Sequence, residues 1–374
     1  MTTALVSGAS VAGLANAYWL AQHGYSVTVV ERCDGLRPGG QAIDVRGPAL
    51  SILDRMGLLP AVAGKKTAIR GASFVDKDGN ELSRDTEATP TGGVIDNPDI
   101  EILRDDLVEL LHDAVHDDVE FIYDDTITGL DDHGDAVAVT FEKADARDFD
   151  LVVGADGLHS NVRKLAFGPE AQYIRPIATF MAIFTVPNFL DLDYWQMYHQ
   201  SDSTMAGVYS ARNNTEARAM FAFMDPDLRL DYRDTAAQFA ELDHRMAHDG
   251  WVRPQLLEYM RTAPDFYFDG LAQIIMDNWA TGRVVLAGDA AHCSSPMSGQ
   301  GTSLALLGAY ILAGELAEAG HDHERGFANY DATFRGYVER TQQLVDLDEG
   351  MNGGPIAPDD FHEVVHSITL KEYA

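Results

Sequence analysis

The chain has 374 residues, of which 46% are hydrophobic and 9% aromatic, which suits two domains or one large α/β domain. Its 27 basic and 59 acidic residues give a formal net charge of −32. A surface this acidic repels phosphate groups, so we expect neither nucleic acid nor a membrane as a partner. Two cysteines, Cys33 and Cys293, cannot form a disulfide framework, and no uncharged stretch is apolar enough to span a bilayer. We therefore expect a cytoplasmic protein.

The first elements in chain order form a predicted βαβ unit, with strands over residues 3–7 and 26–31 and a helix over residues 13–23. The turn before the helix reads Gly-Ala-Ser-Val-Ala-Gly, and an acidic residue follows the second strand. Such a turn places helix N–H groups against a pyrophosphate, while the acidic side chain accepts hydrogen bonds from a ribose. The pattern predicts a dinucleotide site without separating NAD from FAD; a glycine-rich turn without a ligand is the alternative, because serine replaces the middle glycine. The residues assigned to this site are Gly8, Ser10, Val11, Ala12, Gly13, Glu31 and Arg32.

A glycine loop over residues 37–46 follows and enters a strand. Apolar residues at helical spacing then predict a helix that ends at Gly57. A Lys-Asp-Gly-Asn sequence predicts the turn of a hairpin over residues 69–83. Further strands are predicted at 100–103, 119–123, 136–142 and 149–153, with a helix beginning at Asp105.

Between residues 175 and 277 the pattern changes to alternating apolar runs, which predict an antiparallel sheet. Its strands are predicted at 179–186, 194–199, 205–210 and 219–224, and two helices at 235–247 and 254–260. A buried strand at 283–287, an apolar helix at 304–316 and a last helix at 327–345 complete the chain. We predict a discontinuous nucleotide-binding domain (1–174 and 278–320), an inserted substrate-binding sheet domain (175–277) and a C-terminal helical region (321–374).

Two further motifs lie far from the first one. One runs from Asp150 through Asp156-Gly157 to Arg163, and the other is Arg-Val-Val-Leu-Ala-Gly-Asp289 continuing to Gly299-Gln-Gly. With these three motifs in this order, the chain resembles the class A FAD-dependent monooxygenases, the family of para-hydroxybenzoate hydroxylase. Within that family it looks most like the branch of tetracycline-inactivating and polyketide-hydroxylating enzymes. The resemblance implies an α/β fold with a GR2-type Rossmann-like FAD-binding domain, an inserted antiparallel β-sheet substrate domain and C-terminal helices.

The resemblance also implies which residues bind FAD in the later motifs and in the loops between them. They are Gln41, Arg104, Asp156, Asp289, Pro296, Gly299, Gln300 and Gly301. Glycines at the last turn allow close approach to the flavin, where N–H donors and a helix dipole stabilise negative charge on the reduced ring. Two alternatives stay open: Arg104 as a surface residue, and Asp156 with Arg163 as a brace for their turn. No residue is assigned as a catalytic acid, base or nucleophile, and no metal site is expected.

The resemblance implies a monooxygenase that uses NAD(P)H as a transient reductant and O2. It would insert one oxygen into an aromatic, phenolic or polyketide-like molecule through a flavin C4a-hydroperoxide, as a monomer or homodimer. The substrate pocket is expected in the sheet domain, where Met197, Met205, Met220 and Met224 form either core or an apolar pocket wall. The alternatives are a flavin-dependent reductase or halogenase on the same fold, or a non-catalytic flavin-binding sensor.

Overall fold

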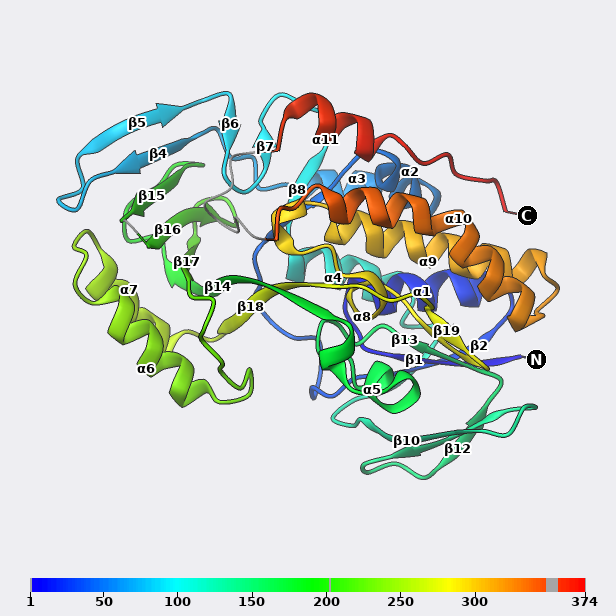
Figure 1. Ribbon diagram of the computed structural model, residues 1–374. Helices are drawn as coiled ribbons and strands as arrows, with labels where there is room; N and C mark the ends of the chain where they lie inside the picture. The colour runs from blue at the N-terminus through cyan, green and yellow to red at the C-terminus, as the bar shows by residue number, and fades with distance from the viewer. Residues whose placement is uncertain (1, 202, 348–355, 374) are drawn as a thin grey trace.

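The computed structural model describes residues 2–201, 203–347 and 356–373 and divides into two parts around separate sheets (Figure 1). The first sheet has the order β19-β20-β13-β1-β2-β9, and every pair in it is parallel except β19–β20. Its central strands are buried and apolar, as expected for a parallel sheet covered on both faces. The strands are β1 (Thr3–Ser7), β2 (Ser26–Val30), β9 (Glu120–Ile122), β13 (Leu151–Gly154), β19 (Ala280–Thr281) and β20 (Val284–Leu286).

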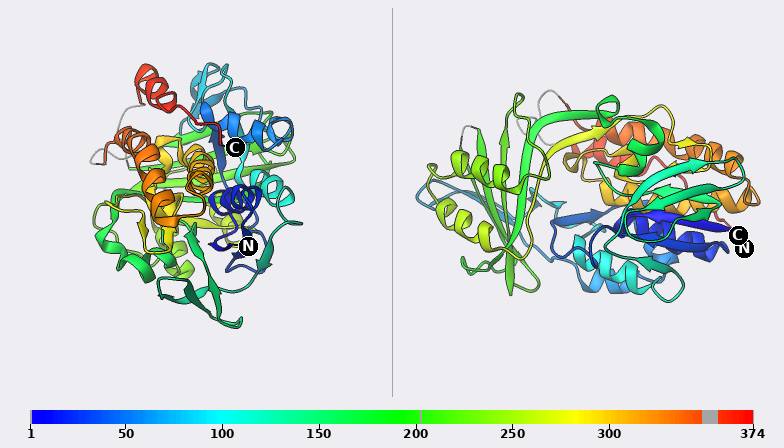
Figure 2. Two further views of the ribbon diagram at one scale, coloured as in Figure 1. Left: turned by 90° about the vertical axis from the view of Figure 1, so that its right-hand side faces the viewer. Right: turned by 90° about the horizontal axis from the view of Figure 1, so that it is seen from below.

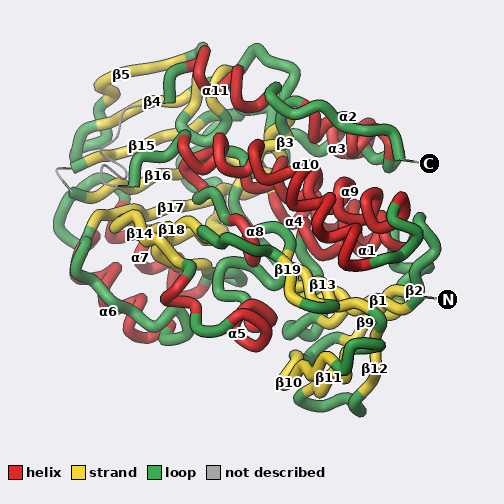
Figure 3. The backbone as a smooth tube through the Cα atoms, turned by 45° about the vertical axis from the view of Figure 1, so that its right-hand side comes forward, coloured by secondary structure: helices red, strands yellow, loops and turns green. Residues whose placement is uncertain are grey.

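Helices cover one face of this sheet, and a small antiparallel sheet lies on the other side (Figure 3). The helices are α1 (Val11–Gln22), α4 (Arg104–Asp113), α9 (Gly301–Glu318) and α10 (His323–Gln343); the small sheet comprises β10 (Ile127–Asp132), β11 (Val137–Phe141) and β12 (Arg147–Phe149). Helix α9 packs between α1 and α10, and its residues 303–316 are all buried. The predicted all-round burial of this apolar helix is therefore confirmed.

The second sheet has seven strands in the order β18-β14-β17-β16-β15-β4-β5. They are β4 (Ala72–Val75), β5 (Glu81–Asp85), β14 (Ile174–Pro187), β15 (Gln196–Gln200), β16 (Thr204–Ala211), β17 (Glu216–Met224) and β18 (Tyr267–Ile274). Helices α6 (Thr235–Met246) and α7 (Arg253–Thr262) pack on one face through an apolar cluster that includes Phe221 and Phe223. Figure 2 shows this sheet at one end of the molecule and both termini at the other.

The hairpin β4–β5 joins this second sheet through a parallel pairing of β4 with β15. The predicted domain division had placed these residues with the nucleotide-binding part. That division stays a prediction, but the hairpin is hydrogen-bonded to the other sheet. Its place follows from long-range pairing, which no local sequence pattern reports.

The remaining elements are short. They are β3 (Ala42–Val45), α2 (Pro48–Arg55), α3 (Leu59–Gly64), β6 (Ala88–Thr89), β7 (Gly93–Val94), β8 (Ile100–Leu103), α5 (Asn161–Phe167), α8 (Asp289–His292), α11 (Pro358–Val365) and two 3-10 turns (Glu170–Gln172 and Pro296–Ser298). Strands β3 and β8 pair antiparallel and carry the loop before β3 toward the second sheet. Among the described residues, no helix is both long and apolar enough to cross a membrane.

Candidate functional site

The first motif forms a tight turn between β1 and α1. Gly8 has a φ of +104°, and a Cβ atom added there would lie 2.6 Å from the carbonyl oxygen of Ala155. A Cβ atom at Gly13 would lie 1.8 Å from the carbonyl oxygen of Gly8. No side chain caps the start of α1 at Ser10, so its first N–H groups and its positive dipole end face outward. This turn can bind an anionic phosphate through backbone atoms alone.

Glu31 follows β2 directly and turns back toward this loop. Its carboxylate accepts hydrogen bonds from the backbone N–H groups of Ala9 (2.8 Å) and Cys33 (3.0 Å). The neighbouring Arg32 is exposed. The acidic side chain predicted at the strand end therefore lies beside the phosphate-binding turn, and its contact with a ribose stays a prediction.

The three motifs meet in space, although about 280 residues separate the first from the last. Gly8 of the first motif contacts Ala155 of the second. A Cβ atom at Gly288, in the third motif, would lie 2.6 Å from the Cβ of Ala12 in the first. These approaches require glycine, because any side chain would occupy the space of a neighbouring backbone or Cβ atom. The structure thus brings the predicted segments into one site.

The second motif braces its own turn. The half-buried Asp156 carboxylate accepts hydrogen bonds from the Ser160 hydroxyl and from the backbone N–H groups of Asn161 (2.8 Å) and Val162 (3.1 Å). Burial raises the pKa of Asp156, while these hydrogen bonds lower it. The direct partners of Asp156 are thus in its own turn and in helix α5. It braces the turn without the pairing with Arg163 that the alternative expected, and its contact with FAD stays a prediction.

Arg163 connects the second motif to the third. Its guanidinium is fully buried and donates to the carbonyl oxygen of Ala290 (2.9 Å) and to the Glu170 carboxylate (2.8 Å). Burial lowers the pKa of Arg163, and the negative charges of Glu170 and Asp156 counteract that shift. The pairing of Arg163 is therefore with Glu170, not with the carboxylate of Asp156 in its own motif.

The third motif presents one exposed carboxylate among buried neighbours. Asp289 begins α8 and is exposed, whereas Gly288 and Ala290 on either side are buried. The protein surrounding its carboxyl group raises the pKa of Asp289. A ligand hydroxyl could donate to this exposed carboxylate.

The turn after Asp289 leaves polar groups without protein partners. It passes through Pro296 in a 3-10 turn and through Gly299, which has a φ of +60°. Gln300 is fully buried, yet neither its amide oxygen nor its amide nitrogen has a hydrogen-bond partner among the described residues. Next to it, a Cβ atom added at Gly301, the first residue of α9, would meet no atom within 4 Å. Buried polar atoms without partners beside open space at a helix N-terminus fit a bound ligand with polar ring edges.

Arg104 is buried rather than exposed, so the surface alternative is wrong. Its Nη2 donates to the carbonyl oxygens of Arg37 (2.9 Å) and Gly39 (2.6 Å), and its Nε has no partner among the described residues. Burial, with the positive charge of Arg37, lowers the pKa of Arg104 to about 10. The backbone of Gln41 accepts a hydrogen bond from the Arg104 N–H group (3.0 Å), so both predicted residues lie in one loop junction.

Sequence reasoning missed Arg46, which connects the last turn to the loop between β6 and β7. This buried side chain donates to the carbonyl oxygens of Gly299 (3.2 Å) and Gly92 (3.0 Å) and pairs with Asp44 (2.8 Å). Burial raises the pKa of Asp44 to about 7, although Arg46 lowers it. A partial signal was present, because Asp44 in β3 and Arg46 just after it stand on either side of the apolar Val45. Beside this cluster lies a cavity of about 240 Å³, lined in part by Asp44, Thr67, Thr89, Asp99 and Glu101.

The face of the second sheet opposite α6 and α7 carries an apolar cluster that we call the methionine wall. It comprises Ala72, Phe74, Met181, Ile183, Tyr198, Met205, Met220 and Ala222. Two of the four predicted methionines, Met205 and Met220, belong to it. Met197 instead packs on the opposite face with α6 and α7, and Met224 is half-buried at the end of β17.

The arrangement fits FAD. It offers an uncapped helix N-terminus for a pyrophosphate, an exposed carboxylate for a ribityl hydroxyl, and unpaired polar atoms in a glycine turn for the flavin ring. His292 and Cys293 lie within the third motif but point into the core: His292 bonds the Tyr330 hydroxyl (3.1 Å), and burial raises the pKa of the Cys293 thiol. These contacts fit structural roles for both side chains.

Comparisons with known proteins give the same result. The sequence matches the family described as "FAD binding domain" over residues 1–344. It is 69% identical over 373 residues to the uncharacterized protein Rv1260 of Mycobacterium tuberculosis (strain H37Rv), with 100% of both chains covered. It is 39% identical over 338 residues to a flavin-dependent monooxygenase from an unknown prokaryotic organism, covering 90% of this chain and 87% of that protein. The fold is similar to the crystal structure of tetracycline destructase Tet(55), with a TM-score of 0.87, 35% identity and coverage of 99% of this chain and 98% of that chain.

The family match contains all three motifs and the whole of the second sheet. The predicted fold class, the FAD cofactor and the assignment to the oxidoreductases are confirmed by these matches. The chain belongs to the family of FAD-dependent monooxygenases.

Proposed function

We propose that the protein uses NAD(P)H and O2 to insert one oxygen atom into an aromatic, phenolic or polyketide-like small molecule. The observation that carries the proposal is the position of the methionine wall relative to the last turn of the third motif. The last turn, from Asp289 to Gly301, offers Gln300 amide atoms without partners among the described residues, and the methionine wall offers apolar side chains from the second sheet. Met181 of the wall and Met297 of the last turn pack against the same apolar cluster, so the two surfaces are neighbours. An apolar wall next to a polar cofactor site suits a substrate with a large ring system.

Bound FAD supplies hydride acceptance and the activation of O2. The chain supplies the binding geometry: the α1 N-terminus holds the phosphates, and the uncapped start of α9 stabilises negative charge at the turn around Gln300. The apolar wall excludes water from the reacting groups. In the overall balance, NAD(P)H and the substrate C–H bond each give two electrons to O2. One oxygen atom enters the substrate and the other leaves as water.

Similarity to a tetracycline destructase makes tetracyclines the first compounds to test, followed by simple phenols and other polyketides. The purified protein, loaded with FAD, is mixed with NADH or NADPH under air, and cofactor oxidation and oxygen uptake are followed together. We expect a substrate to accelerate both and to yield a product heavier by one oxygen atom. Accelerated NAD(P)H oxidation without an oxygen-containing product would contradict the proposal and favour a reductase, and no acceleration by any compound would favour a sensor.

A further inference from the structure

The glycine loop before β3 is held by the second sheet as well as by Arg104. Arg218 on β17 reaches across from the second sheet, and its Nε donates to the carbonyl oxygen of Gly40 (3.1 Å). Beside it, the Tyr209 hydroxyl on β16 accepts a hydrogen bond from the backbone N–H of Ala42 (3.0 Å). Tyr209 and Arg218 face each other in the β16–β17 register. Two neighbouring side chains of the second sheet thus hold two backbone groups of the loop.

Gly40 lies between two arginines from different parts of the molecule. A Cβ atom added at Gly40 would lie 2.5 Å from the Nε of Arg104, while Arg218 binds the carbonyl oxygen of the same residue. Arg104 also binds the preceding carbonyl, that of Gly39. The carbonyl groups of Gly39 and Gly40 are therefore each bound by a guanidinium group, one from each part of the molecule.

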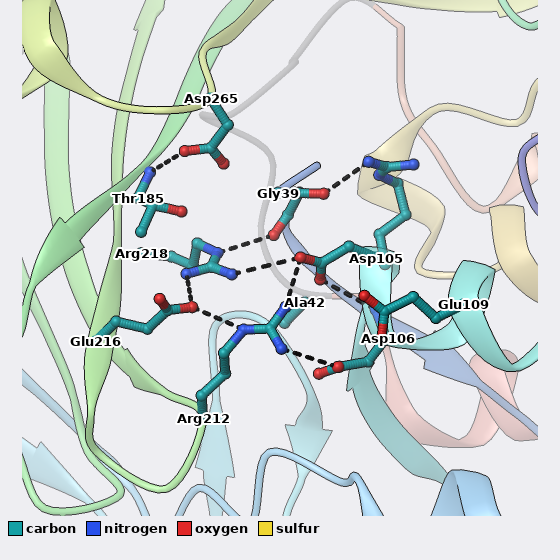
Figure 4. Close-up of polar contacts among 12 residues, drawn as sticks. Gly39, Ala42, Asp105, Asp106, Glu109, Thr185, Arg212, Glu216, Arg218 and Asp265 are labelled. Atoms are coloured by element: carbon teal, nitrogen blue, oxygen red, sulfur yellow. Dashed lines mark hydrogen bonds and ion pairs between the residues drawn. The ribbon is translucent and has the colours of Figure 1, made fainter. Parts of the chain in front are cut away.

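Acidic side chains balance the charge of Arg218. Only 1% of its side chain is exposed, and its Nη1 donates to Glu216 (2.7 Å), while its Nη2 lies 3.9 Å from Asp105. A buried guanidinium is stable only with such partners. Arg212 contacts the same two carboxylates and also Asp106, as Figure 4 shows. Arg212 is about one-third exposed, and within the described part of the chain its guanidinium pairs with these carboxylates and not with the glycine loop.

Arg218 also connects the loop to the methionine wall. Arg218, Met220 and Ala222 alternate along β17, so their side chains lie on the same face of the sheet. The opposite face carries Ala219 and Phe221, which pack with the cluster under α6 and α7. One strand therefore presents the loop contact and part of the wall in succession.

We propose that Arg218 is a positioning residue for FAD: it fixes the glycine loop of residues 37–42 from the second sheet, so that the cofactor site is complete only when both parts are in place. The inference depends on the FAD site and not on the proposed oxygen transfer. An ion pair that merely stabilises the sheet is the competing explanation. The two explanations predict different results for cofactor binding. Only a positioning role makes the affinity for FAD depend on the side chain at residue 218.

The experiment compares Arg218→Gln and Arg218→Lys with Arg212→Gln, a control that removes a guanidinium from the same acidic cluster. Each apoprotein is titrated with FAD and followed by the quenching of flavin fluorescence, and amide hydrogen exchange is measured for the peptide covering residues 37–42. We expect Arg218→Gln to weaken FAD binding about tenfold, or about 1.4 kcal/mol, and to speed exchange in this peptide. Arg212→Gln is expected to stay within twofold of the unmodified protein in both measurements.

Arg218→Lys is expected to recover part of the affinity for FAD. An ammonium group can donate to the Gly40 carbonyl oxygen, but it cannot contact that oxygen and the Glu216 carboxylate through separate nitrogens as a guanidinium does. The inference would be overturned if Arg218→Gln bound FAD normally, or if Arg212→Gln weakened binding as much. Should thermal unfolding show that Arg218→Gln does not fold, Tyr209→Phe replaces it. That variant removes the acceptor of the Ala42 N–H group, and we expect about threefold weaker FAD binding; unchanged binding would overturn the inference.

Discussion

In the nucleotide-binding part, the three motifs meet through backbone atoms, whereas the second sheet contacts that part through long side chains. Gly8 approaches Ala155, and Gly288 approaches Ala12, at distances that exclude any larger residue. From the other side, Arg218 and Tyr209 extend whole side chains to reach the loop before β3. The first kind of contact requires glycine, which has no side chain, and the second requires a particular long side chain. Substitutions should therefore act differently in the two parts.

The largest effect is expected where backbone meets backbone. In Gly13→Ala the new methyl group would need the space of the Gly8 carbonyl oxygen, 1.8 Å away, so α1 must move from its phosphate-binding position. We expect loss of bound FAD after purification and a lower free energy of unfolding, by about 1–3 kcal/mol. Gly64→Ala is the matched control, because a Cβ atom at that exposed helical position meets nothing within 4 Å. Visible absorbance and thermal unfolding measure the two effects, and a yellow, stable Gly13→Ala protein would contradict the packing argument.

The next effect concerns the single exposed carboxylate of the third motif. Asp289→Ala removes an acceptor for a cofactor hydroxyl while leaving the neighbouring buried residues unchanged. We expect FAD affinity to fall about tenfold to a hundredfold, since a hydrogen bond to a charged group contributes about 1.5–3 kcal/mol. Asp148→Ala, on an exposed edge of β12, serves as the control. Equal FAD dissociation constants for the two variants would remove Asp289 from the proposed site.

A smaller effect is expected from substitutions in the methionine wall, and they should not change the affinity for FAD. Met220→Leu conserves volume, so its cost in stability should be under about 1.5 kcal/mol. If the wall contacts substrate, the KM for that substrate should change by about threefold to tenfold while the dissociation constant for FAD stays the same. Met197→Leu is the matched control, because Met197 packs on the opposite face of the same sheet. An equal change in KM for both variants would mean that the wall acts only as core.

The difference between the two parts also explains what could be predicted from sequence. Glycine positions at strand ends are local signals, so the turns at Gly8 and Gly299 were predicted together with their cofactor. The hairpin β4–β5 was predicted as a hairpin, but its parallel pairing of Phe74 with Tyr198 joins segments more than 120 residues apart. Nothing in the hairpin itself indicates that partner.

Buried charged residues were the other limit. Arginine is usually found on the protein surface. The burial of Arg104 and Arg218 follows only from the carbonyl groups and carboxylates that the fold places around them. Arg46 was closer to being predictable, because it directly follows a short strand that carries Asp44, and a buried charge requires a partner. Specific long-range polar contacts therefore could not be predicted from the sequence, whereas the backbone motifs could.

The smallest predicted effect is the pH dependence of the stabilisation by His159, which contacts both parts of the molecule. Its ring bonds Glu170 (2.9 Å) and Asp269 on β18 (3.0 Å) and stacks on Tyr232. Burial lowers the pKa of His159, but the two carboxylates outweigh it and raise the pKa to about 9. Because the folded state binds this proton more tightly than the unfolded state, the stabilisation is complete below about pH 6.5 and is lost as the pH rises through about 9.

His159→Gln tests this contact without removing hydrogen-bonding capacity. We expect the free energy of unfolding of the unmodified protein to exceed that of the variant most at pH 6, and the difference to shrink by about 1 kcal/mol by pH 10, after allowance for solvent screening. Only the difference between the two proteins is informative, since many other groups titrate over this range. His116→Gln, at an exposed histidine beside Asp117, is the control variant. A difference that stayed constant from pH 6 to pH 10 would mean that His159 joins the two parts as a neutral ring. The charges of Asp269 and Glu170 would then have no role in holding the second motif against the second sheet.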